Sequence, residues 1–314
     1  EEADANEYLI RNRRRRSISV KISRADRIYD EHRETIDELV EFFIQRGRLP
    51  RRDESIDLQH RLRDAVGGLR RAWSVVRNVT EGTDWEAITA GRCDDLLVDL
   101  ALLKLNRRPN FMALPEATRH DIKEFFGSYK QATAEADQLL FSSGNTELVD
   151  ETANAATVGK RLPTALYVHE SALSDLAPVL RVYEGCARWV VGEIDDANVI
   201  KLATNKPKVS YLSYPKFDKE PHPALRETIF VRLWNLDVDW RSYEDSTNRP
   251  ILHRKEQFVA DDYPLRNRFV RLTEQEERFQ IYDTDLRMIG YQDGWDDRLR
   301  EGGVALSGHR VVRR

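Results

Sequence analysis

Two histidines of this sequence lie in loops that neighbouring prolines would stiffen. His222 lies between two prolines, and His253 follows a proline by three residues, with Glu256 three residues further on. Such a loop can hold a polar side chain at a site, and histidine can transfer a proton or bind a metal near neutral pH. His222, His253 and Glu256 could therefore converge as the base and metal ligands of a hydrolytic enzyme such as a nuclease. Ordinary hydrogen-bonded turn histidines would give the same pattern.

Arginine and lysine gather in short clusters that offer donors to phosphate oxygens. The clusters are Arg13–Arg16; Arg46, Arg48, Arg51 and Arg52; Lys201, Lys206 and Lys208; and His253, Arg254 and Lys255. Tyr211, Tyr214 and Trp240 lie near some of them and could stack on bases. The chain has 50 basic and 54 acidic residues, so only local clusters could attract nucleic acid. Each cluster could equally be a solvated face balanced by neighbouring acids.

No catalytic or metal-binding motif is present in the sequence. The run Val182–Arg188 has partial similarity to the glycine-rich turn of a methyl-donor site, but the residues after Gly185 are too large and the run fits a helix better. The seven histidines match no metal-ligand spacing, and no phosphate-binding loop or nucleophile elbow occurs. We therefore predict no metal site and no cofactor in this chain.

The elements that must position these clusters fall into two kinds. Apolar residues recur at helical spacing over about 27–46, 56–79, 84–105 and 115–142. Past Gly159, one helix is expected over about 171–192, strands over 198–202, 208–214 and 228–243, and helices over 264–280 and 293–301. The sequence predicts an α+β protein, in which an all-helical module is followed by an α+β domain with a mostly antiparallel sheet. We place a basic arm or linker at 1–25, the helical domain at 26–157 and the α+β domain at 158–314.

Length and composition indicate a folded protein that is not embedded in a membrane. The chain has 314 residues, of which 40% are hydrophobic, and it contains no apolar run long enough to span a bilayer. No stretch at the start has the form of a signal peptide, so we expect a cytoplasmic protein. Cys93 and Cys186 lie in separate helix-like segments and predict neither a disulfide nor a zinc site.

Several runs, in order along the chain, resemble the methyltransferase family associated with DNA phosphorothioation. The runs are Phe42–Pro50, Asp121–Lys130, Gly159–Pro163, Ala165–His169, Leu180–Arg188, Val209–Pro215, His222–Leu225 and Ile251–Glu256. The resemblance implies a bacterial protein of a restriction-modification type of system, which accompanies the insertion of sulfur into the DNA backbone as a defence against phage. In that family an N-terminal domain carries the S-adenosylmethionine-binding turn.

This chain has no such turn, and it opens with Glu1. We therefore expect a C-terminal portion without the S-adenosylmethionine domain, and no catalytic residue is carried over from the family. The leading hypothesis is a DNA-engaging or target-selecting region, with DNA, phosphorothioated or not, and other proteins of the same defence system as partners. The alternatives are the hydrolytic enzyme described above and a protein-interaction scaffold that docks partners on its helical half.

Overall fold

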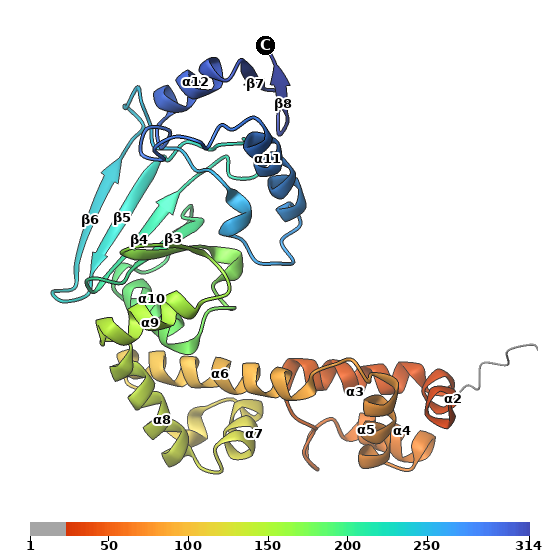
Figure 1. Cartoon of the computed structure of the whole chain (residues 1–314). Coiled ribbons are helices and arrows are strands. Elements are labelled where there is room, and N and C mark those ends of the chain that lie inside the picture. Colours follow the sequence, from red (N-terminus) through yellow and green to blue (C-terminus); the bar gives the residue numbers. More distant parts are fainter. Residues whose placement is uncertain (1–22) are drawn as a thin grey trace, which may run out of the picture. The chain divides into compact units, whose positions relative to one another are not determined.

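The computed structural model of the chain describes residues 23–314 (Figure 1). Contacts between backbone positions divide the chain into two compact units, which separate after Arg92. The division falls inside α6 (Trp85–Leu103), earlier than the predicted boundary at 157/158, because the helices that follow pack with the sheet-bearing half. Arg13–Arg16 and most of the predicted arm lie outside the described residues. Ser23 caps the first described helix through a hydrogen bond from Asp26.

The N-terminal unit is helical, as expected, but its helices are shorter than the sequence predicted. It contains α2 (Arg24–Glu31), α3 (Arg33–Arg46), α4 (Ile56–Val66), α5 (Leu69–Val79) and the start of α6. The single helix expected over 56–79 is wrong, because Gly67 ends α4 with a φ of 88° and Gly68 precedes α5. The apolar faces of these helices enclose a small core around Ile36, Leu62 and Val76.

The C-terminal unit begins with helices that the sequence predicted only in part. After α6 come two short 3₁₀ helices, η1 (Lys104–Asn106) and η2 (Phe111–Ala113), then α7 (Glu116–Phe125), α8 (Tyr129–Ser142) and α9 (Thr146–Ala155). The helix expected over 115–142 is divided at Gly127, whose φ is 70°, and Ser128 caps the second half. Helix α9, which Asn145 caps, was not predicted from the sequence.

The rest of the C-terminal unit is built on an antiparallel sheet of six strands, which confirms the predicted α+β class. The strands follow one another in chain order: β1 (Lys160–Leu162), β2 (Ala165–His169), β3 (Val199–Ala203), β4 (Lys208–Ser213), β5 (Glu227–Arg232) and β6 (Asp237–Ser242). The 3₁₀ helix η3 (Glu170–Ala172) and α10 (Pro178–Val191) connect β2 to β3. The helix predicted from 171 therefore starts later, with Pro178 in its first turn.

The two faces of the sheet have different coverings (Figure 1). Residues such as Leu166, Ile200 and Val209 form a core with α9 and α10 on one face. The segment after β6 contains η4 (Lys255–Gln257), α11 (Arg266–Arg278), α12 (Gln292–Glu301) and the hairpin of β7 (Val304–Leu306) and β8 (Val311–Arg313). This segment packs Phe258 and Phe269 against Val199, on the opposite face. Within residues 23–314, no helix is both long and apolar enough for a membrane crossing.

The turn before β1 depends on a glycine, and this gives a test of the fold. Gly159 has a φ of 86°, and a Cβ atom there would lie 2.8 Å from the carbonyl oxygen of Tyr167. We expect Gly159→Ala to lower the free energy of unfolding by about 2 kcal/mol or more in urea titration, since it adds a clash to the cost of the left-handed backbone.

Gly127→Ala is the matched control, because Gly127 has a similar φ of 70° but no atom within 4 Å of the added Cβ. We expect it to cost only about 1 kcal/mol. Equal effects of the two substitutions would contradict the close approach at Gly159.

Candidate nucleic-acid interface

The strand register directs two of the predicted lysines to the face of the sheet opposite α10. Successive residues of a strand alternate between faces. Ile200 and Leu202 face the core with α10, so Lys201 between them points to the other face. On β4, Val209 faces the same core, and Lys208 therefore lies on the face of Lys201. Lys206 lies in the turn between the two strands. We refer to Lys201, Lys206 and Lys208 as the lysine corner.

The hydroxyl group of Tyr183, on α10, binds the turn between β3 and β4. The backbone N–H of Lys208 donates to Oη of Tyr183 at 2.8 Å. The same hydroxyl lies 2.9 Å from the carbonyl oxygen of Ala203 and 3.1 Å from that of Lys206, so it can donate to either. Because Tyr183 is only 2% exposed, these bonds form away from water. The core helix therefore fixes the spacing of the lysines on the opposite face.

The three ammonium groups of the lysine corner have no ion-pair partner within residues 23–314. Nζ of Lys201 lies 5.0 Å from the ring centre of Tyr167, and Nζ of Lys208 lies 4.1 Å from that of Phe230. The pKa of Lys208 is lowered, mainly by burial. The nearby positive charges of Lys206, Arg232 and Lys201 lower this pKa further. The charge of Asp239 opposes this effect in part. The corner thus gathers positive charge without a direct ion pair, and the ammonium groups of Lys201 and Lys208 lie over aromatic rings.

The neighbouring arginine of the same face differs from the lysines. Arg232 lies opposite Lys208 in the register, and its guanidinium is paired with Asp237 and, at 3.0 Å, with Asp239. Its charge is therefore balanced within the sheet. The contrast indicates that the lysine corner, and not the whole face, is available to an external anion.

The arginine cluster of the N-terminal unit is divided between structural and exposed side chains. Arg48 is 3% exposed, and its guanidinium donates to both carboxylate oxygens of Glu54, at 2.6 and 2.9 Å. Arg46 and Arg51 are half-buried and Arg52 is exposed. Arg48 therefore stabilises the loop before α4, and the cluster does not present four equivalent donors on its surface.

The cluster of His253, Arg254 and Lys255 is also held by contacts within the fold. Nζ of Lys255 donates to the carbonyl oxygens of Phe217 and Glu220, at 2.5 and 2.7 Å, and the residue is only 2% exposed. Arg254 forms an ion pair with Glu277 at 3.1 Å and lies 4.2 Å from the ring centre of Tyr282. Contact with a phosphate would require these groups to leave their partners.

His222 and His253 do come together, but in a buried network and not around Glu256. Their Nδ1 atoms are 3.1 Å apart, and Nε2 of His222 lies 2.6 Å from Oε1 of Glu276, a residue that was not predicted to belong to a site. Burial, and then His222, lowers the pKa of His253 to about 3.

Glu256 instead accepts a hydrogen bond from Thr273 at 3.0 Å, and burial raises its pKa. Within residues 23–314, His222, His253 and Glu256 do not bring one ligand atom each to within 4.8 Å of one another. The geometry therefore does not support the metal-dependent hydrolytic site that the sequence allowed.

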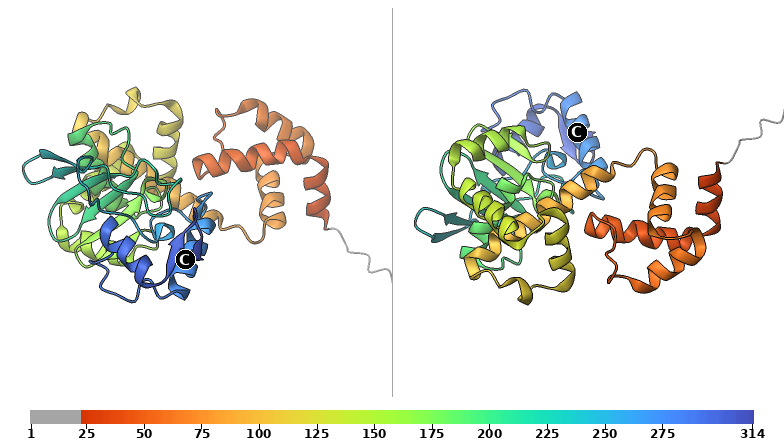
Figure 2. Two further views of the ribbon diagram at one scale, coloured as in Figure 1. Left: turned by 90° about the horizontal axis from the view of Figure 1, so that it is seen from above. Right: turned by 90° about the horizontal axis from the view of Figure 1, so that it is seen from below.

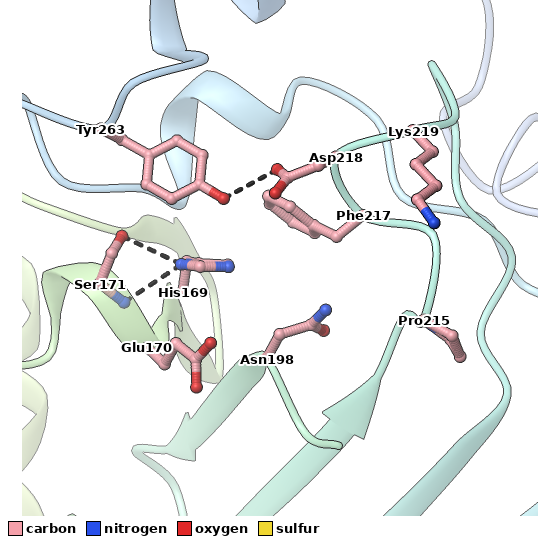
Figure 3. A pocket seen from close by; sticks show the side chains of 9 residues that line it. All are labelled: His169, Glu170, Ser171, Asn198, Pro215, Phe217, Asp218, Lys219 and Tyr263. Carbon is pink, nitrogen blue, oxygen red and sulfur yellow. Dashed lines mark hydrogen bonds between the residues drawn. The ribbon is translucent and has the colours of Figure 1, made fainter. Parts of the chain in front are cut away.

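A cavity of about 570 Å³ at the end of the sheet was not predicted (Figure 3). Nδ1 of His169 accepts the backbone N–H of Ser171 at 3.1 Å, and burial lowers the pKa of His169 to about 4. The neutral ring thus carries its hydrogen on Nε2, which points into the cavity in Figure 3. Across from it, Asp218 accepts a hydrogen bond from Tyr263 at 2.8 Å. Glu170, Asn198 and Lys219 also line the cavity, which therefore offers two carboxylates and several donors. Lys255 holds the loop that carries Asp218 through its bonds to residues 217 and 220.

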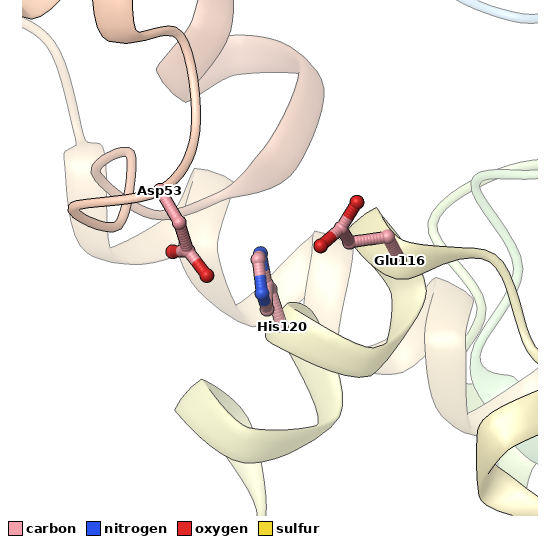
Figure 4. A group of neighbouring side chains, drawn as sticks. All are labelled: Asp53, Glu116 and His120. Atoms are coloured by element: carbon pink, nitrogen blue, oxygen red, sulfur yellow. The ribbon is translucent and has the colours of Figure 1, made fainter.

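Helix α7 carries a further histidine and acid at a spacing of four residues. Figure 4 shows Glu116 and His120 on adjacent turns of α7, where their side chains share one face. Asp53, which is also drawn, belongs to the N-terminal unit. Two side chains of one helix are fewer than the three or four protein ligands of a typical zinc site, so we assign no metal to α7.

The aromatic residues that the sequence offered for base stacking are placed differently. Tyr211 and Tyr214 are buried, with exposures of 1% and 4%, and belong to the cores on the two faces of the sheet. Trp240 is 58% exposed on the edge strand β6. Stacking by the two tyrosines would require the cores to open.

Comparisons with known proteins do not identify a relative. No protein-family model matches the chain, and neither a curated protein nor a solved structure shows a significant match. The resemblance to the phosphorothioation-associated family therefore rests on the sequence runs given above.

Removal of the Tyr183 hydroxyl tests how the lysine corner is held. Tyr183→Phe leaves the N–H of Lys208 and the carbonyl groups of the turn without their buried partner. We expect a loss of about 1–3 kcal/mol in the free energy of unfolding and faster hydrogen exchange at the Lys208 amide. Tyr291→Phe is the control, since Tyr291 is 48% exposed. An effect no larger than that of the control would show that Tyr183 does not hold the turn.

The buried ammonium of Lys255 predicts a pH dependence of stability. Burial lowers the pKa of Lys255 from 10.5 to about 7. Between these two values the unfolded chain binds the proton more strongly than the folded chain, so this group makes stability rise with pH. From pH 7 to pH 9 we expect wild type to gain about 2 kcal/mol relative to Lys255→Met, measured by urea unfolding at both pH values. A parallel response of the two proteins would contradict a buried, neutralisable Lys255.

Proposed function

We propose that the C-terminal unit binds the sugar–phosphate backbone of DNA through the lysine corner. The observation that carries this proposal is the gathering of Lys201, Lys206 and Lys208 without an ion-pair partner among the described residues, on a protein whose net charge is −4. Mutual repulsion of these charges disfavours the unbound state, and a phosphate between them relieves it.

The geometry favours contact with the backbone and not with bases. Lys201 lies opposite Ser210, and Lys208 is two residues from Ser210, so the two lysines are diagonal neighbours at about 7–8 Å between their backbone positions. Lysine is a compact charge without the fork that reads a guanine edge. Such contacts position a protein on DNA and carry no sequence information themselves. The expected binding is therefore tight at low salt and tolerant of sequence.

The resemblance to the phosphorothioation-associated family supplies the biological setting of the proposal. In that setting the chain is the DNA-engaging or target-selecting part of a bacterial defence methyltransferase. It acts in the cytoplasm together with other proteins of the system. Its substrate is DNA, with or without phosphorothioate in the backbone. Methyl transfer belongs to a separate S-adenosylmethionine-binding domain, since the sequence has no cofactor turn.

Charge removal at the corner tests the proposal. We expect the substitution of Lys201, Lys206 and Lys208 by glutamine to weaken the binding of a fluorescent duplex at least tenfold at low salt. Each phosphate contact contributes about −0.9 to the slope of log affinity against log salt, so the slope should become less steep by about 2.7. Fluorescence anisotropy at several salt concentrations measures both effects.

The matched control removes the same charge elsewhere in the C-terminal unit. Lys123, Lys130 and Lys216 are exposed, and their replacement by glutamine should leave the slope unchanged. Absence of wild-type binding at low salt would refute the proposal, and so would equal losses in the two triple variants.

A further inference from the structure

The last strand of the sheet is an exposed edge with apolar side chains. All residues of β6 are exposed, and β6 is the end strand of the sheet, paired with β5 alone among residues 23–314. Val238 and Trp240 are 42% and 58% exposed, and Trp234 and Leu236 in the preceding turn are 55% and 56% exposed. In both views of Figure 2, the teal hairpin of β5 and β6 lies at the outer margin of the C-terminal unit. Such an edge is a template for another strand.

The hydrogen-bond pattern shows which backbone groups of β6 point outward. The N–H of Tyr243 donates to the carbonyl oxygen of Arg226 at 2.7 Å, in line with the register of β5 and β6. Antiparallel ladders alternate, so Asp237, Asp239 and Arg241 also direct their backbone groups to β5. Val238, Trp240 and Ser242 direct theirs to the open edge. The outward N–H of Trp240 donates a hydrogen bond to Oδ1 of the neighbouring Asp239 at 2.9 Å.

We propose that β6 pairs antiparallel with β6 of a second copy of this chain, centred on Trp240. In this register Trp240 lies opposite its own symmetry mate, and Val238 lies opposite Ser242, so outward-pointing backbone groups meet each other. Asp239 lies opposite Arg241 of the second copy, and the two-fold axis repeats this pair. The interface therefore joins two aromatic rings and two complementary charge pairs.

The neighbouring registers are excluded by charge. A shift that centres the pairing on residue 239 places Asp239 against Asp239, and a shift to residue 241 places Arg241 against Arg241. Like charges directly opposite each other on neighbouring strands are destabilising. A register that pairs an outward residue with an inward one makes no ladder at all. The sequence of β6 is thus self-complementary in one register.

The inferred dimer continues the sheet from one copy into the next. The two-fold axis of an antiparallel pair is perpendicular to the sheet, so equivalent faces of the two six-stranded sheets lie on the same side. The lysine corners of both copies then share one surface. The dimer forms through β6 and does not require DNA.

Charge reversal tests the pairing on the full chain without DNA. Sedimentation velocity over a range of micromolar concentrations should show a wild-type dimer. Arg241→Glu and Asp239→Arg each place like charges opposite one another twice, and each should weaken the dimer at least tenfold. An equimolar mixture of the two variants should recover dimers, because only the mixed pair is complementary at both positions.

Two controls keep the test specific. Asp239→Arg also loses a contact with Arg232, and Asp237→Arg loses the equivalent contact but should keep the dimer. Trp240→Cys should form a disulfide-linked dimer above the wild-type background, since opposed residues of a hydrogen-bonded pair lie about 5.5 Å apart, whereas Val238→Cys should not. A wild type that stays monomeric would overturn the inference. Failure of the mixed variants to associate would also overturn it.

Discussion

The packing of α10 on one face of the antiparallel sheet is the constraint on which the rest of the C-terminal unit depends. Leu166, Ile200 and Leu202 must face this helix to stay out of water, and alternation then sends the residues between them to the opposite face. A slip of one residue would bury Lys201 and expose the core. The same helix supplies Tyr183, whose hydroxyl closes the turn before Lys208. Burial on one face thus determines where the charge lies on the other.

Much of the secondary structure could be predicted because its signals are local. Strands β3 and β4 are rich in β-branched and aromatic residues, and the helix stripes of the N-terminal unit repeat at helical spacing. The errors arise where a short turn lies inside a periodic run. Gly127 and the Gly67–Gly68 pair interrupt stripes that continue on both sides, and the run 228–243 contains the turn between β5 and β6. Short β1 and helix α9 have too few residues for a clear period.

The candidate site was predictable only where its members are close in sequence. Lys201, Lys206 and Lys208 lie within one hairpin, so sequence proximity and spatial proximity coincide. Arg48 and Lys255 carry the same positive charge, but the fold buries both side chains. Glu54, six residues along the chain, binds Arg48, and the carbonyl groups of residues 217 and 220, more than thirty residues away, bind Lys255. No charge count distinguishes a buried ammonium from a solvated one. The cavity at His169 was missed because its walls come from segments about 50 and 90 residues further along the chain.

We propose that DNA lies against the lysine corner, and hydrogen exchange with and without a duplex locates this contact. Mass spectrometry resolves exchange by peptide, so the contact is located and not only detected. Slower exchange on addition of duplex should be concentrated in peptides that cover residues 201–208. Unchanged exchange there, together with slower exchange around residues 46–52, would contradict the claim and assign the contact to the N-terminal unit.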